Sequence, residues 1–126
     1  MLTYNQMVVG LFSSDAFPDE ADADRVFHAL ADSTRRDILA RAIEREQSVS
    51  ALARHYEISL TAIQKHVTVL ERAALVTKNR SGREQLVVAN PETLRRANTL
   101  LAAFEQLWID RANRIAEILN EEGETR

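Results

Sequence analysis

The middle of the chain predicts two short helices separated by a turn of only a few residues. Ser48 or Ser50 can cap the first helix, which we expect to end near Tyr56. Ser59 can cap the second, in which apolar residues recur at helical spacing over 60–73. Two helices joined by so short a turn are typical of a helix-turn-helix, so this segment predicts that unit.

Two runs rich in β-branched residues, 75–79 and 84–88, follow the second helix and flank Ser81 and Gly82. Their partial alternation around a Ser-Gly turn predicts a β-hairpin. A hairpin directly after a helix-turn-helix is the order of elements found in a winged helix. We therefore expect a mainly α fold with a small β-hairpin wing, that is, a winged helix-turn-helix.

Further helices are predicted on both sides of this unit. Apolar residues at helical spacing indicate helices over 2–12, 22–31 and 33–46. After the hairpin, the pattern over 92–122 fits one long helix, or two with a bend near residues 102–103. The expected parts are an N-terminal helix and linker (1–21), a winged helix-turn-helix core (22–90) and a C-terminal dimerisation segment of one or two helices (91–126).

Capping residues and apolar faces support these boundaries. Asp32 is expected to cap the helix over 33–46, and Asn90 followed by Pro91 is expected to begin the C-terminal helix. The residues that we expect in the core are Ile38, Leu39, Ala42 and Ile43 on the first of these helices and Ile63, Val67, Leu70 and Ala74 on the helix over 60–73.

The composition excludes several classes of protein. The chain has 126 residues, 45% hydrophobic and 28% charged, which fits one globular domain. It has no cysteine, which excludes disulfides and thiolate metal sites and fits a reducing cytoplasm. Its apolar runs are too short to span a bilayer and no basic leader begins it, so we expect a cytoplasmic protein with no membrane partner.

The charge is unevenly distributed along the chain. The formal net charge is −3, which by itself disfavours binding to nucleic acid. Residues 13–24 contain five acidic residues and no basic one, whereas residues 60–83 contain five basic residues and one acidic. Because the local field rather than the net charge attracts phosphate, the second segment remains a candidate for nucleic-acid binding.

One side of the helix over 60–73 carries hydroxyl, amide and cationic groups and no carboxylate. Such a side is more often merely solvated on an isolated helix, but this helix follows a tight turn and precedes a hairpin with a basic tip. Its groups suit a helix in the major groove of double-stranded DNA, with the hairpin tip reaching the backbone or minor groove. The residues are Thr61, Gln64, Lys65, Thr68 and Arg72 on the helix and Lys78, Arg80 and Arg83 at the predicted tip.

An apolar seam on the C-terminal helix predicts a homodimer through the terminal helices. Residues at 3-4 spacing run from 94 to 118, with Arg111 where the spacing predicts an apolar residue. Part of the seam can be intramolecular core, but so long a face exceeds what one small domain covers. Two recognition helices about 34 Å apart can then read an inverted-repeat operator. The predicted interface residues are Met7, Val8, Leu11, Phe12, Leu101, Phe104, Trp108 and Ile115.

Five segments, in order along the chain, resemble the ArsR-type (ArsR/SmtB-like) winged-helix regulators. They are 30–39 (LADSTRRDIL), 49–59 (VSALARHYEIS), 60–76 (LTAIQKHVTVLERAALV), the wing GREQ at 82–85, and the Leu-Trp pair at 107–108. The resemblance implies a homodimer built on terminal helices, recognition helices in successive major grooves, and repression by promoter occupancy.

The resemblance also carries site residues onto this chain. It implies DNA contacts from Ser59, Thr61, Gln64, Lys65 and Thr68, and wing contacts from Arg80 and Arg83. The sequence departs from the family where Glu57 and Ala74 stand in place of a frequent glycine. Both positions lie at helix ends, where glycine eases a left-handed turn, so the docking angle of the helix depends on them.

No metal, cofactor or catalytic site is expected. The family's paired-cysteine site has no counterpart here, and its site on the C-terminal helix needs histidine, which does not occur after His66. His28, His55 and His66 fall on three different predicted helices, and a structural hydrogen bond suits His66 better than a metal. The chain has no nucleophile elbow, no glycine-rich phosphate loop and no residues at the spacing of metal ligands. We therefore expect that the protein is not an enzyme.

One alternative to a DNA-binding repressor remains, and one further function could be added to it. The winged fold can serve as an interaction module for proteins, but such a face would more often expose leucine, phenylalanine or methionine than cations. The protein can also sense a small molecule in a dimer crevice, although the sequence identifies no effector.

Overall fold

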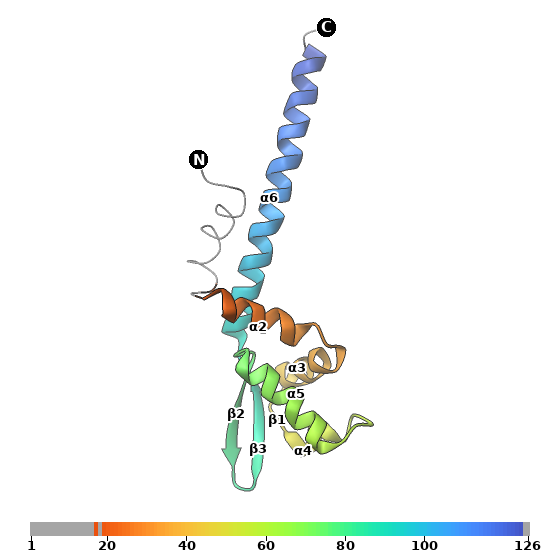
Figure 1. Cartoon of the computed structure of the whole chain (residues 1–126), viewed down its shortest axis with the longest axis vertical. Coiled ribbons are helices and arrows are strands. Elements are labelled where there is room, and N and C mark those ends of the chain that lie inside the picture. The colour runs from red at the N-terminus through yellow and green to blue at the C-terminus, as the bar shows by residue number, and fades with distance from the viewer. Residues whose placement is uncertain (1–16, 18, 125–126) are drawn as a thin grey trace.

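The computed structural model describes residue 17 and residues 19–124. The predicted helix over 2–12, with the interface residues expected on it (Met7, Val8, Leu11 and Phe12), lies outside the described residues. The elements are α2 (Glu20–Leu30), α3 (Ser33–Glu44), β1 (Gln47–Ser48), α4 (Val49–Ala53), α5 (Leu60–Arg72), β2 (Val76–Ser81), β3 (Glu84–Ala89) and α6 (Pro91–Glu124). The predicted winged helix-turn-helix is confirmed (Figure 1).

Polar side chains begin the helices as the sequence predicts. The carboxylate of Asp32 accepts a hydrogen bond from an α3 backbone amide at 3.0 Å, and the Ser59 hydroxyl accepts one from α5 at 3.1 Å. Ser48, rather than Ser50, caps α4 by accepting from Ala51 N at 3.0 Å. These bonds satisfy amides that would otherwise lack a partner, and they fix where each helix begins.

Three predicted helix boundaries differ in the structure. α2 begins two residues earlier than expected, because Asp19 caps it by accepting from a backbone amide at 3.0 Å. α3 ends at Glu44, since the next residues turn into β1. α4 ends at Ala53 instead of near Tyr56, which gives a longer turn before α5.

The wing is part of a three-stranded antiparallel sheet with the order β1-β3-β2. β2 and β3 form the predicted hairpin, paired from Val76–Ala89 to Ser81–Glu84. Gly82 opens the turn with φ +62°, a conformation that glycine adopts without strain. β1 was not predicted, because two residues carry no β pattern and they pair only with distant partners on β3.

The core lies between the helices and one face of this sheet. Val26, Ile38, Leu52, Ile63 and Val87, from five different elements, are all at most 1% exposed. The predicted inward faces of α3 and α5 are confirmed for every residue except two. These are Ile43, which is 55% exposed at the edge of its stripe, and Ala74, which lies beyond the end of α5.

The end of α5 is a Schellman motif built around Ala74. Ala74 has φ 59°, and it is the one non-glycine residue of the described chain with a positive φ. The amide of Leu75 donates to Leu70 O at 3.0 Å, and the amide of Ala74 donates to Glu71 O at 2.9 Å. The backbone therefore turns left-handed at residue 74, one of the two positions where the family often has glycine. At the other position, Glu57, φ is not positive.

The carbonyl of Ala74 also joins α5 to the start of α6. It accepts hydrogen bonds from Asn90 Nδ2 at 3.0 Å and from the buried Thr93 Oγ1 at 2.6 Å. Asn90 Oδ1 in turn accepts from the amide of Glu92 at 3.3 Å, so the predicted start of the last helix is confirmed. Hydrogen bonds to this one carbonyl therefore connect the end of α5 to the start of α6.

α6 is a single helix of 34 residues without the alternative bend. At 1.5 Å per residue it is about 50 Å long, and it extends from the core away from the wing (Figure 1). Ala97 is the last of its residues buried in the core. Within the described part of the chain, no helix is long and apolar enough to cross a membrane.

Candidate nucleic-acid interface

Two adjacent arginines at the start of α3 hold α2 in place. Arg35 donates from Nε to Ala29 O at 2.9 Å and from Nη2 to His28 O at 3.0 Å. Arg36 donates to Leu30 O at 2.8 Å. The carbonyls at a helix C-terminus lack helical partners and carry partial negative charge, so these cations stabilise the end of α2.

The same guanidinium group reaches the recognition helix. Arg35 Nη1 lies 3.4 Å from Nδ1 of His66 on α5, and Asp32 Oδ2 lies 3.9 Å from the same nitrogen. His66 is half-buried in this contact, which fits the structural role predicted for it. α2, α3 and α5 therefore meet at one polar junction.

A second polar cluster fixes the turn of the helix-turn-helix. The Tyr56 hydroxyl, in the turn, donates to Asp37 on α3, and Arg41 Nε donates to the same carboxylate at 2.9 Å. Partial burial, followed by the bond to Asp37, raises the pKa of Tyr56 to about 12. The bonds from Tyr56 and Arg41 lower the pKa of Asp37. The turn before α5 is thereby tied to α3.

α5 presents the predicted polar side to solvent. Ile63, Val67 and Leu70 are fully buried on one side of it. On the other side, Thr61, Gln64, Lys65 and Arg72 are exposed. Together with Thr68 and Val69 they line an open groove of about 360 Å³ that contains no carboxylate. Ser59 is also exposed, and its role as a cap uses the hydroxyl oxygen only as an acceptor.

The side chains of Thr68 and Lys78 form contacts within the protein that the sequence did not predict. Thr68 is half-buried and its hydroxyl donates to Gln64 O at 2.9 Å. Lys78 lies at the base of the wing, with Nζ 3.4 Å from Thr68 Oγ1 and 3.5 Å from Glu71 Oε1. The predicted place of Lys78 at the hairpin tip is therefore wrong, because β2 continues to Ser81.

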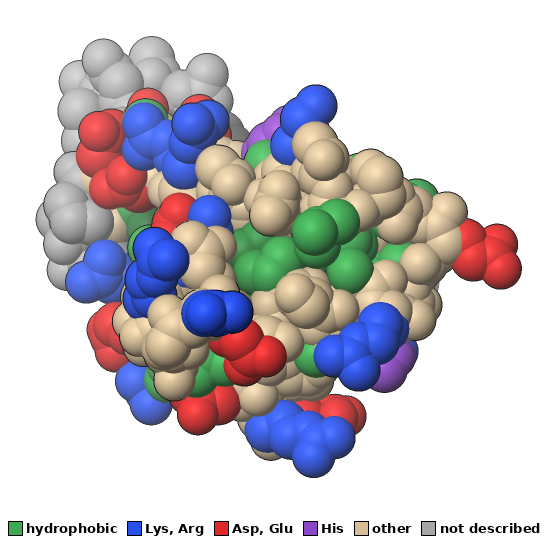
Figure 2. All heavy atoms as spheres, turned by 90° about the horizontal axis from the view of Figure 1, so that it is seen from below, with side chains coloured by type: hydrophobic (Ala, Val, Ile, Leu, Met, Phe, Trp, Pro, Cys, Tyr) green, Lys and Arg blue, Asp and Glu red, His purple; other side chains and the backbone are tan. Residues whose placement is uncertain are grey.

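The wing and the beginning of α5 enclose a second hollow, of about 280 Å³. Its lining residues are Val49, Ser50, Leu60, Gln64, Arg80, Arg83, Glu84 and Gln85. Gln64 lines both hollows, so the helix groove and the wing arginines form one continuous surface. Figure 2 shows the molecule from this end, with apolar side chains in the middle and both basic and acidic side chains around them.

Sequence reasoning missed several residues of this surface. Leu60 was not assigned to it, although its place one helical turn before Gln64 was a usable signal. Gln85 faces the hollow only because the hairpin has this register, which the sequence did not fix. Among the described residues, no group of three or more histidines or carboxylates could hold a metal ion.

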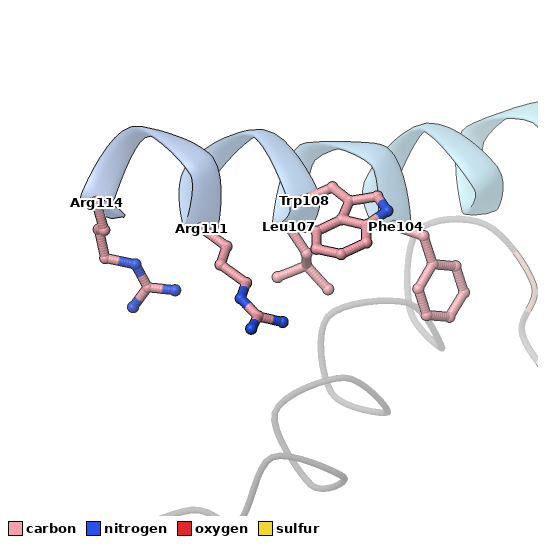
Figure 3. A pocket seen from close by; sticks show the side chains of 5 residues that line it. All are labelled: Phe104, Leu107, Trp108, Arg111 and Arg114. Atoms are coloured by element: carbon pink, nitrogen blue, oxygen red, sulfur yellow. The ribbon is translucent and has the colours of Figure 1, made fainter. Parts of the chain in front are cut away.

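The part of α6 beyond Ala97 presents a second, apolar surface. Exposed fractions are 55% for Leu101, 45% for Phe104, 67% for Trp108 and 49% for Ile115. Figure 3 shows part of this face, where five side chains line a hollow of about 430 Å³. They are Phe104, Leu107, Trp108, Arg111 and Arg114. The guanidinium of Arg111 lies 5.6 Å from the centre of the Trp108 ring.

Comparison with known proteins gives consistent matches. Residues 30–79 match the family described as "Helix-turn-helix domain". The chain is 42% identical over 79 residues to the uncharacterized HTH-type transcriptional regulator YuzN of Bacillus subtilis, covering 57% of this chain and 86% of that one. It is 33% identical over 101 residues to the HTH-type transcriptional regulator Rv2034 of Mycobacterium tuberculosis, covering 80% and 92%. Transcriptional repressor SdpR of B. subtilis is 32% identical over 59 residues, covering 47% and 66%.

Solved structures agree with these relatives. An ArsR-like transcriptional regulator from Rhodococcus sp. RHA1 superposes with a TM-score of 0.70 at 33% identity, covering 79% of this chain and 93% of that one. A homodimeric winged helix-turn-helix DNA-binding domain from Mycobacterium bovis, described as a possible ArsR-family regulator, gives 0.57 at 28% identity, covering 69% and 82%.

The fold and the surface formed by α5 and the wing define a transcriptional regulator with a helix-turn-helix DNA-binding domain. The relatives and solved structures named above are described as transcriptional regulators, not as enzymes. The chain belongs to the ArsR family of winged helix-turn-helix regulators.

Proposed function

We propose that the protein is a homodimeric repressor that binds an inverted-repeat operator in double-stranded DNA and acts by occupying a promoter. The observation that carries this proposal is the continuous surface of α5 and the wing, in which Gln64 and Lys65 are exposed next to Arg80 and Arg83. The name of the relative SdpR, a transcriptional repressor, favours repression.

The chemistry of this surface fits the major groove. Gln64 offers the amide that pairs with adenine, and Lys65 can donate to guanine O6 and N7. We assign Arg80 and Arg83, which line the hollow next to Gln64, to the phosphate backbone beside the groove. The proposed contacts are Ser59, Thr61, Gln64, Lys65, Thr68 and Arg72 on α5 and Arg80 and Arg83 on the wing. We assign Lys78 to holding the wing against α5, because it is bound to Glu71.

The apolar face of α6 supports the dimer. Leu101, Phe104, Trp108, Ile115 and Ile118 recur at alternating spacings of three and four, with Arg111 in the same series. Such a stripe is typical of helices that pair, and exposed apolar area on this scale marks an interaction site. The M. bovis neighbour is described as homodimeric, which favours the same assembly here. We therefore assign residues 22–90 to DNA binding and 91–126 to dimerisation.

A footprint on the DNA upstream of the protein's own gene tests the binding. We expect protection of an inverted repeat, with affinity that falls steeply as salt rises. Gln64→Ala should lower specific binding by about 1–3 kcal/mol and leave non-specific binding nearly unchanged. Arg83→Ala, as the matched control, should weaken both similarly because phosphate contacts carry no base information. Unchanged sequence preference in Gln64→Ala would show that the face is wrongly assigned.

The oligomeric state tests the dimer. Ile115→Asp places a charge in the apolar series and should shift the sedimenting species from dimer to monomer, because a carboxylate is costly to bury unpaired. Asn113→Asp, on the opposite side of α6, is the matched control and should remain dimeric. A wild-type protein that sediments as a monomer at micromolar concentration would contradict the proposal.

A further inference from the structure

Leu60 is an apolar residue exposed in the middle of the proposed DNA surface. It is the first residue of α5, and it is 46% exposed. Helical spacing places it near Ile63 and Val67, which are fully buried, yet no neighbour covers it to the same degree. Instead it lines the hollow of about 280 Å³ together with Gln64 and Arg83.

The surroundings of Leu60 fit DNA as the occupant of this hollow. Two arginines, Arg80 and Arg83, line it beside one carboxylate, Glu84. The space-filling view from this end shows apolar side chains in the centre, with Lys and Arg among the charged side chains around them (Figure 2). Cations at the rim attract the phosphate backbone and bring base edges to the centre, where an apolar side chain needs an apolar partner.

We propose that Leu60 contacts the C5-methyl group of a thymine, so that Leu60 and Gln64 together select A·T pairs in each half-site. The thymine methyl is the apolar group that base edges present in the major groove, and a glutamine pairs with adenine N6 and N7. This inference rests on the proposed DNA-binding function and deepens it, because it assigns the base chemistry that the first turn of α5 reads.

The geometry of the helix allows both contacts at once. Leu60 and Gln64 are four residues apart and lie on neighbouring positions of one side of α5. The rise between them is about 6 Å, which corresponds to roughly two base-pair steps of 3.4 Å. The first residues of a recognition helix are also those that contact base edges in helix-turn-helix proteins.

Replacing thymine with uracil removes only the C5-methyl group, so it measures the contribution of that group to binding. An operator selected from random duplexes by the wild-type protein is remade with each A·T pair changed singly to A·U. We expect one position per half-site at which the change weakens wild-type binding about fourfold, the effect of one buried carbon. For Leu60→Ala the same change should have no effect, whereas Leu60→Met, which keeps an apolar tip, should retain the sensitivity.

Ile58→Ala is the matched control, because Ile58 is 43% exposed nearby but does not line the hollow. It should keep the wild-type response to uracil. If wild type binds the operator but ignores every uracil, or if Leu60→Ala responds like wild type, the inference is wrong while the proposed function stands. If random duplexes yield no preferred sequence, both are wrong, and an apolar hollow that binds a protein partner becomes the alternative.

Discussion

Arg35 joins three helices through one half-buried guanidinium group, so its loss should affect stability more than its position near the surface suggests. It donates to two carbonyls of α2 and approaches His66 on α5. Hydrogen bonds from charged groups contribute about 1.5–3 kcal/mol, so Arg35→Ala should lower the free energy of unfolding by about 2 kcal/mol in urea. Arg36→Ala, which removes one exposed bond, should cost about 1 kcal/mol or less. Equal losses would contradict this account.

Ala74 is strained by its backbone conformation. A left-handed φ costs a residue with a Cβ about 1–2 kcal/mol, while glycine loses about 0.5–1 kcal/mol more entropy on folding. The Ala74 side chain is exposed and makes little packing contribution. Ala74→Gly should therefore raise the free energy of unfolding by about 0.5–1 kcal/mol. Ala73→Gly is the control: Ala73 is right-handed and 5% exposed, so this change should destabilise the protein.

At the level of elements, the sequence predicted those features that depend on neighbouring residues. It did not predict those that depend on residues far away in the chain. Asp32 and Ser59 are capping residues whose effect depends on neighbours three positions away, and both predictions are confirmed. β1 could not be predicted, because Gln47 and Ser48 become a strand only by pairing with residues almost forty positions later. Lys78 was placed at the tip because the hairpin was read as shorter than it is, and its partner Glu71 depends on how β2 packs against α5.

For the candidate site, helical periodicity separated the buried side of α5 from the polar side correctly. It did not identify Leu60, since the period describes a helix interior and the exposure at a helix end depends on which elements pack there. The residues on the wing that share its hollow are brought there by tertiary structure. A sequence pattern therefore predicts which side of a single helix is exposed. The surface that the helix and the wing form together follows only from the three-dimensional structure.

The turn between α4 and α5 should weaken at alkaline pH through Tyr56. Its folded-state pKa of about 12 lies above the ordinary value near 10, so the neutral hydroxyl stabilises the fold. That contribution is complete below about pH 10 and is lost as pH rises to about 12. The difference in unfolding free energy between wild type and Tyr56→Phe should shrink or invert across this window, as measured by urea unfolding at each pH. A constant difference would show that Tyr56 does not titrate this way.

At the scale of the whole molecule, the proposed DNA surface and the exposed face of α6 lie on different parts of the fold. The wing and α5 are at one end, and α6 extends from the other (Figure 1). The hydrogen bonds at Ala74 O link the end of α5 to the start of α6. Pairing of α6 between two copies would therefore set the spacing of the two recognition helices through a short, well-bonded connection.

The position of Arg111 in the apolar series favours one direction of pairing. Parallel helices would place Arg111 against Arg111 of the second copy, and like charges at such close range repel. Antiparallel helices can instead place Arg111 against Trp108 of the second copy, a favourable cation–π contact. Within one protomer the Arg111 guanidinium lies 5.6 Å from the centre of the Trp108 ring, so these two side chains already form a contact of this kind. We therefore expect antiparallel pairing with residue 108 opposite residue 111.

Disulfide cross-linking measures this register directly, because the chain contains no cysteine of its own. If residue 108 lies opposite 111, then residue 104 lies opposite 115, and a Phe104→Cys, Ile115→Cys double variant should form a covalent dimer on mild oxidation. Each single variant should stay uncrosslinked, since the two like positions are about 16 Å apart along the helix axis. Parallel pairing predicts the reverse, with cross-links in each single variant, because like residues then face each other at a distance that a disulfide can bridge.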